Sequence, residues 1–185
     1  LNYISAGAEV ITTATFSSRL IRMEQNKVDH LFEFANKKAC ELALKAKQIS
    51  KKEIFIAGSI PAQFDTYKED TRENKIIYDS FSRQINCIIE YVDFIYLDVI
   101  SSGREIAIAT EIIEKFNKPI LVGIHLSKNG NLTSGEKIEE VINKYKSSSW
   151  VGIVSSCVSM EIAEASINEL KICLLYTSPS PRDEQ

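Results

Sequence analysis

Residues 93–124 read DFIYLDVISSGREIAIATEIIEKFNKPILVGI, and this stretch decides the fold class. A short apolar run at 94–98 is followed by a longer run at 103–116, in which apolar residues recur at helical spacing. A second short apolar run, at 119–124, comes directly after it. A strand, a helix and a strand in this order predict a βαβ unit with parallel strands.

The same alternation extends along the chain in both directions. Strands are predicted at 9–15, 53–58 and 150–155, and helices at 27–49, 75–91, 135–146 and 160–170. Five strands that alternate with helices predict an α/β fold with a helix-covered parallel sheet. An open doubly wound sheet and a closed (β/α)₈ barrel both fit this pattern. No GxGxxG or GxxxxGK[ST] motif follows a strand, which disfavours nucleotide binding, and five units without an edge strand favour part of a barrel.

The composition describes one globular unit of ordinary kind. The 185 residues are 44% hydrophobic and 25% charged, with a net charge of −3. No basic stripe indicates nucleic acid as a partner, and no apolar run approaches the roughly 20 residues that cross a membrane. Four scattered cysteines without a CxxC pair indicate reduced thiols in a cytoplasmic protein.

The two ends of the chain do not read like natural termini. The first residue is Leu1 rather than Met, and no basic start with an apolar block indicates a signal peptide. The last stretch, CLLYTSPSPRDEQ at 173–185, resembles a sequencing adapter translated as if it were coding. We therefore predict one partial barrel domain at 1–172 and a non-native tail at 173–185. A natural disordered tail is the alternative, because Ser and Pro also suit one.

Polar residues stand where the predicted strands end, which is where parallel βα folds gather their working groups. They are Thr13, Thr15, Gly58, Ser59, Asp98, His125, Ser156 and Cys157. The two threonines also suit a strand, and His125 also suits an ordinary loop. Asp98 either caps the following turn or binds a substrate ammonium in a partly dry pocket.

Cys157 is the residue that could bind a metal. It follows the last strand, where a thiolate would point into the mouth of a barrel. A catalytic zinc ion needs three protein ligands, and no other Cys or His outside the tail is obviously placed to join it. The residues alone leave a metal ligand and a core thiol as alternatives.

Six blocks in order resemble motifs of the homocysteine S-methyltransferase family. They are YISAGAEVITTATF at 3–16, FANKKACELA at 34–43, IAGSIP at 56–61 with Tyr67 six residues on, DFIYLD at 93–98 followed by Arg104 and Glu105, GNLTSG at 130–135 and SCVSME at 156–161. The resemblance implies a zinc-dependent (β/α)₈ barrel, of which this chain supplies roughly strands two to six and lacks both ends.

The resemblance also implies an activity and a site. A methyl group would move from a sulfonium or related donor to the zinc-bound thiolate of homocysteine, giving methionine, with both substrates as small-molecule partners. Cys157 would be one ligand of Zn²⁺, Asp98 would hold the homocysteine ammonium, and the pocket would be lined by Thr13, Thr15, Gly58 and Ser59. Such an in-line displacement needs mainly positioning, so no residue is assigned an acid–base role. Ser17 stands where betaine-using members carry an aromatic hydroxyl, which favours S-methylmethionine or S-adenosylmethionine as donor.

Several departures from the family pattern keep other readings open. Asp98 replaces a Glu, Val99 a Thr, Ser156 an Asn and Met160 a Pro. The family's remaining zinc cysteines would lie beyond this chain, so we expect the 185 residues neither to hold zinc tightly nor to turn over. The alternatives are a degenerate relative that serves as a binding or scaffold protein, and an unrelated parallel α/β enzyme in which Cys157 is a core thiol.

Overall fold

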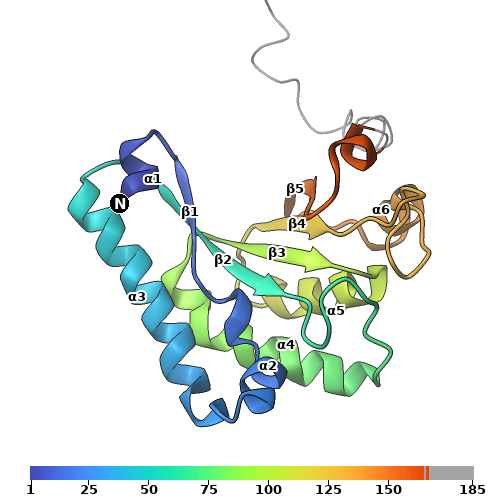
Figure 1. Ribbon diagram of the computed structural model, residues 1–185, viewed down its shortest axis with the longest axis horizontal. Coiled ribbons are helices and arrows are strands. Elements are labelled where there is room, and N and C mark those ends of the chain that lie inside the picture. Colours follow the sequence, from blue (N-terminus) through green and yellow to red (C-terminus); the bar gives the residue numbers. More distant parts are fainter. Residues whose placement is uncertain (165, 167–185) are drawn as a thin grey trace, which may run out of the picture.

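A single parallel sheet of five strands organises the fold (Figure 1). The computed structural model describes residues 1–164 and 166, so the predicted tail at 173–185 lies outside the described residues. The strands are β1 (Val10–Thr12), β2 (Phe55–Pro61), β3 (Phe94–Ile100), β4 (Ile120–Ile124) and β5 (Trp150–Ser155). All four pairings are parallel, which confirms the predicted α/β class.

The order of the strands separates the two architectures that fit the sequence. The sheet runs β1-β2-β3-β4-β5, so each strand pairs with its neighbour in the chain. A doubly wound sheet reverses its order at a switch point, whereas consecutive barrel strands do not. Since crossovers between parallel strands are right-handed, an unreversed order places the helices on one face. The described sheet is therefore an arc of a barrel.

The helices occur where the apolar periodicity predicts them, with shifted ends. The long ones are α3 (Phe32–Ser50), α4 (Asn74–Ile88), α5 (Gly103–Glu114) and α6 (Ile138–Tyr145). The short ones are α1 (Asn2–Ser5), α2 (Leu20–Gln25) and three 3₁₀ turns, η1 (Phe16–Ser18), η2 (Asp29–Leu31) and η3 (Ile89–Tyr91). Of the helix predicted at 160–170, helical backbone is described at 160–164, and most of the rest lies outside the described residues. Among the helices that the structure describes, none is both long and apolar enough to cross a membrane.

Two strands are longer than predicted, which changes where the site begins. The β2–β3 pairing continues from Ala57 opposite Phe94 to Pro61 opposite Asp98. Hydrogen bonding to a neighbouring strand thus carries β2 three residues past the predicted end at 58. The predicted strand 53–58 leaves Ser59 in the loop that follows; this is wrong, because Ser59 lies within β2. β1, in contrast, ends at Thr12 and is shorter than predicted.

The apolar core lies between the sheet and the helices α3, α4 and α5. Ile95 and Leu97 of β3 are fully buried there, whereas Tyr96 and Asp98 between them are partly exposed. Successive strand residues point to opposite faces, so Tyr96 and Asp98 lie on the face away from the helices. This inner face carries the polar groups of the candidate site.

Candidate functional site

Hydrogen bonds join most of the predicted site residues into one network. The hydroxyls of Thr13 and Thr15 lie 2.8 Å apart, and the Thr15 hydroxyl donates to the Ser59 carbonyl oxygen at 2.5 Å. The Ser59 amide donates to the Thr13 hydroxyl at 3.1 Å, and the Ser59 hydroxyl donates to the Asp98 carboxylate at 2.9 Å. The C-terminal ends of β1, β2 and β3 are thereby tied together around one carboxylate.

Asp98 is the charged centre of this network. Burial raises the pKa of its carboxyl, while hydrogen bonds from Ser59 and Tyr96 lower it in part. A carboxylate that has lost water in this way gains from a cation placed beside it, which would lower its pKa again. The arrangement suits the recognition of an ammonium group.

Tyr96 is a residue of this site that the sequence reasoning missed. Its hydroxyl lies 2.6 Å from the Ser156 hydroxyl, and burial raises the pKa of Tyr96 to about 12. Gly123 of β4 makes room for the ring, since a Cβ there would lie 2.6 Å from Tyr96 Cε2 and 2.5 Å from the Leu97 carbonyl oxygen. The strand alternation that places Asp98 on the inner face also places Tyr96 there and could have identified it.

Cys157, Tyr67 and His125 form the second part of the site. Cys157 is an exposed free thiol just after β5. A hydrogen bond with this thiol raises the pKa of the Tyr67 hydroxyl, and the Asp98 carboxylate acts in the same direction. The Tyr67 and His125 rings lie 4.5 Å apart, and His125 Nδ1 lies 3.1 Å from the Ser156 carbonyl oxygen. The loop after β2 thus reaches across the sheet edge to the ends of β4 and β5.

Left-handed backbone conformations also occur at this edge. Tyr67, Val99 and Cys157 have φ angles of 70°, 61° and 56°. Val99 lies in an irregularity of the β3–β4 pairing between Leu97 and Ile100. A β-branched residue rarely adopts such an angle, and backbone strain of this kind is common at functional sites.

Gly58 is the predicted site residue that faces elsewhere. A Cβ at Gly58 would lie 2.9 Å from Ile88 Cδ1 and 3.2 Å from Val92 Cγ1. The position therefore faces the helix layer, and its small size lets α4 and η3 pack closely against β2. Its neighbour Ser59 carries the contact with Asp98 on the other face.

The described residues do not form a metal site by themselves. No group of three His, Cys, Asp or Glu side chains in residues 1–164 and 166 is arranged to hold a metal ion. Cys157 is the thiol at the site edge, whereas Cys40 and Cys87 are buried. One thiolate with these neighbours does not fit a catalytic zinc ion, which needs three protein ligands.

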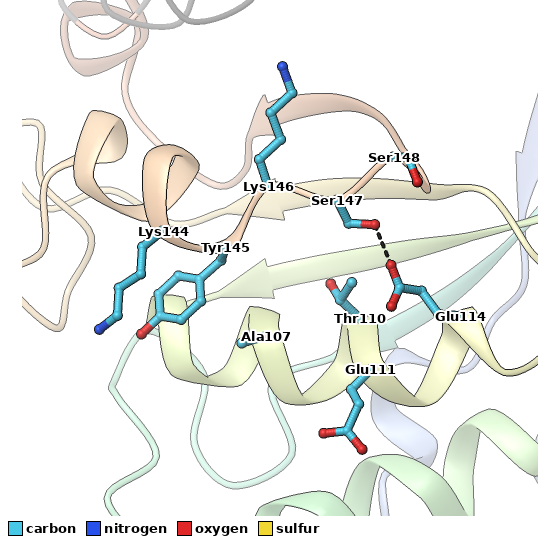
Figure 2. A pocket seen from close by; sticks show the side chains of 9 residues that line it. All are labelled: Ala107, Thr110, Glu111, Glu114, Lys144, Tyr145, Lys146, Ser147 and Ser148. Atoms are coloured by element: carbon cyan, nitrogen blue, oxygen red, sulfur yellow. Dashed lines mark hydrogen bonds between the residues drawn. The ribbon is translucent and has the colours of Figure 1, made fainter.

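A surface groove of about 440 Å³ lies away from this edge, between α5 and the segment after α6 (Figure 2). Glu111 and Glu114 line one side, Lys144 and Lys146 the other, and Ser147 donates a hydrogen bond to Glu114. Ser147 and Ser148 precede β5, so the groove belongs to the end of the sheet opposite Asp98. Its mixed acidic and basic lining resembles an ordinary solvated surface, and the residues that line it are not part of the candidate site.

Comparison with known proteins gives a family match. The family model for homocysteine S-methyltransferase matches residues 1–183. The S-methylmethionine–homocysteine S-methyltransferase BHMT2 of Pongo abelii is 26% identical over 142 residues, which are 74% of this chain and 36% of the relative. The chain thus spans about a third of this curated relative.

Two solved structures have a similar fold. The metallated form of the homocysteine methyltransferase MmuM from Escherichia coli superposes with a TM-score of 0.80 at 16% identity, over 93% of this chain and 66% of that one. Its apo form has a TM-score of 0.73 at 17% identity, over 93% and 65%. The five-stranded arc is therefore similar to about two thirds of a complete methyltransferase structure.

Proposed function

Because the chain belongs to the homocysteine S-methyltransferase family, we propose that its candidate site binds homocysteine for methyl transfer to the homocysteine sulfur. The observation that carries this proposal is the Asp98 carboxylate, which Ser59 orients at the edge where β1, β2 and β3 end. Such an edge is where parallel βα folds place their substrates.

Asp98 is proposed to hold the homocysteine ammonium. Its carboxyl is partly buried, which raises its pKa and makes a cationic partner favourable. Ser59 supplies a hydroxyl donor to Asp98 Oδ2. The side chain of Asp98 is one methylene shorter than that of Glu. Because Asp98 lies within the paired part of β3, the strand fixes how close its carboxylate can come to the homocysteine ammonium.

Thr13, Thr15 and Ser59 are proposed to line the pocket around Asp98. Thr13 and Thr15 are buried, and their hydroxyls bond the Ser59 amide and carbonyl. Gly58 supports the pocket from the helix side, where it permits close packing. These residues position the substrate, which is what an in-line displacement mainly requires.

The proposed reaction moves one methyl carbon between two sulfur atoms. The homocysteine thiol gives its proton to solvent, and the thiolate attacks the methyl group of a sulfonium donor. A new carbon–sulfur bond forms as the donor's carbon–sulfur bond breaks, and its electron pair stays on the leaving thioether. The products are methionine and the demethylated donor. The name of the 26% identical relative and the small Ser17 support S-methylmethionine as the donor.

We propose that Cys157 supplies one ligand of a Zn²⁺ ion whose other ligands lie outside the described residues. The family resemblance and the exposed thiol at the site edge support this role. Bound zinc lowers the pKa of a coordinated thiol, which would favour the homocysteine thiolate. The described side chains alone do not fit a zinc ion, so further ligands would be needed to hold one. The free thiols of Cys40, Cys87 and Cys157 support a cytoplasmic setting. The methionine that the proposed reaction would give supports a role in methionine biosynthesis.

A calorimetric titration with L-homocysteine under reducing conditions tests the proposal. The variant Asp98→Asn keeps the shape and removes the charge, so we expect the affinity to fall about tenfold or more. The control Asp79→Asn removes the same charge from the exposed surface of α4 and should leave the affinity unchanged. Equal affinities of Asp98→Asn and wild type would contradict the role of Asp98. Homocysteine binding by the intact protein without methyl transfer would favour a binding or scaffold relative, as the changes at Asp98 and Val99 would allow.

A further inference from the structure

Arg19 is a buried cation that forms no ion pair with a carboxylate among the described residues. Its side chain is 6% exposed, and Nη2 donates a hydrogen bond of 2.8 Å to the Thr66 hydroxyl. The other donors, Nε and Nη1, are buried and have no hydrogen-bond partner among the described residues. Buried polar groups are normally paired, so these two atoms require an explanation.

Nearby acidic residues do not neutralise this guanidinium. Within the described part of the chain, no carboxylate forms an ion pair with Arg19. Asp65 is the acidic neighbour, but it pairs with Lys68 at 2.9 Å. Burial is the main cause that lowers the pKa of Arg19, and the Phe16 ring covers one face of its guanidinium at 5.5 Å. The Nε and Nη1 donors of the guanidinium therefore remain for a further acceptor.

The position of Arg19 relates it to the candidate site. Arg19 lies four residues after Thr15, which bonds the Ser59 carbonyl. Its partner Thr66 is adjacent to Tyr67, which contacts Cys157 and His125. The guanidinium therefore joins the segment after β1 to the loop after β2, and both of these contribute to the site.

We propose that Arg19 binds the carboxylate of an amino-acid substrate, either homocysteine or its methyl donor. The fixed fork of donors in a guanidinium matches the two oxygens of a carboxylate, and burial strengthens that contact. Asp98 for the ammonium and Arg19 for the carboxylate would make the site selective for zwitterionic amino acids. This inference rests on the proposed function and adds a partner for the substrate carboxylate, which Asp98 does not bind.

The first test uses the unaltered chain with paired ligands. L-Homocysteine is compared with its carboxamide, and S-methyl-L-methionine with its carboxamide, by calorimetry. The amide lacks the charge but keeps the shape, so the acid that docks on Arg19 should bind about tenfold or more tightly than its amide. The pair that shows this difference identifies the substrate whose carboxylate Arg19 holds.

Variants assign the difference to Arg19. Arg19→Gln should reduce the acid-to-amide ratio to about one, and Arg19→Lys should keep part of it because the charge remains. Arg22→Gln is the matched control, since Arg22 is exposed on α2, the helix that begins directly after the N-cap residue Arg19, and loses the same charge. Circular dichroism confirms that each variant is folded, and the comparison of acid with amide on the unaltered chain needs no variant.

The outcomes separate the two proposals. Equal binding of acid and amide in both pairs overturns the role of Arg19 and leaves the proposed function standing. A preference for the acid that survives in Arg19→Gln also overturns it. If none of the four ligands binds the unaltered chain, the proposed function and the role of Arg19 fall together.

Discussion

The Ser59 hydroxyl donates a hydrogen bond of 2.9 Å to the Asp98 carboxylate across the β2–β3 pairing, from 39 residues away in the chain. The register that places Ser59 opposite Tyr96 and Pro61 opposite Asp98 brings the two side chains together. The parallel sheet, rather than a flexible loop, therefore sets the position of the carboxylate.

Removal of this hydrogen bond should make Asp98 a weaker acid. The Ser59 hydroxyl stabilises the charged form, so Ser59→Ala should raise the pKa of Asp98 further. A carbon-detected NMR titration of labelled aspartate carboxyls measures this change. Ser80→Ala removes a hydroxyl that donates to the Ile76 carbonyl on α4, away from Asp98, and should have no effect. An unchanged Asp98 titration in Ser59→Ala would show that the hydroxyl does not act on the carboxylate.

Glu105 should make the fold less stable as the pH rises. It is fully buried at the start of α5, Oε2 accepts from the Ser102 hydroxyl at 2.7 Å, and Oε1 has no partner among the described residues. Burial raises the pKa of Glu105 from 4.5 to about 7. The folded state therefore holds the proton more tightly than the unfolded chain, and the stabilisation present below pH 4.5 is lost as the pH rises through about 7.

This loss is on the order of 3 kcal/mol, and Glu105→Gln should remove it because the amide cannot ionise. Urea unfolding at a series of pH values from 4.5 to 8.5 compares the variant with wild type. Glu111→Gln, at an exposed position of the same helix, should keep the wild-type pH dependence. If the unfolding free energies of Glu105→Gln and wild type differ by the same amount at every pH, Glu105 does not cause the pH dependence.

Gly123→Ala should destabilise the fold at the site edge. The added methyl would lie 2.5 Å from the Leu97 carbonyl oxygen and 2.6 Å from Tyr96 Cε2. Such a clash in a packed region costs about 1–3 kcal/mol, which urea unfolding measures. Gly152→Ala on β5 meets only Leu121 Cδ1, at 3.2 Å, and should cost less. Equal losses of unfolding free energy in the two variants would contradict this prediction. They would mean that β3 and β4 move apart at little cost to accept the methyl group at position 123.

Lys51→Gly should stabilise the end of α3. Lys51 has a left-handed φ of 53° where the helix ends, and glycine adopts this conformation without a Cβ penalty. The expected gain is about 1 kcal/mol, seen as a higher melting temperature. Lys51→Ala keeps the penalty and should give no gain. A rise of similar size in Lys51→Ala would assign the effect to the lost charge instead.

The 185-residue chain should retain much less than one equivalent of zinc. Within residues 1–164 and 166, no three side chains are arranged as metal ligands, and one thiolate binds zinc weakly. Metal analysis after gel filtration in zinc-free buffer measures the content. One equivalent of zinc that disappears in Cys157→Ser would contradict this expectation and would support a site completed by residues outside the described range.

The sequence predicted which segments form strands but not where β2 and β3 end. Short apolar runs with β-branched residues identified every strand, since such runs suit a buried parallel sheet. The ends depend on the partner: β2 continues to Pro61 because β3 offers hydrogen bonds up to Asp98. No local composition signal reports that pairing, so Ser59 was expected in a loop.

The sequence predicted the site residues that follow strands, but not those that a loop brings to the site. Asp98, Thr13 and Thr15 follow apolar runs, and their place along the chain indicates the edge where the strands end. Tyr67 reaches Cys157 and His125 only through a loop with a left-handed residue, and the sequence carries no signal for such a path. The zinc ligand role of Cys157 and the domain bounds 1–172 stay predictions.

The unreversed order of the five strands has a consequence for synthesis of the chain. Each of β2, β3, β4 and β5 pairs with the strand translated before it, so these pairings need no distant part of the polypeptide. The units can dock one after another as they leave the ribosome, from β1 towards β5. Ribosome-bound chains stopped after α4 should therefore already protect the β1–β2 pairing from proteases.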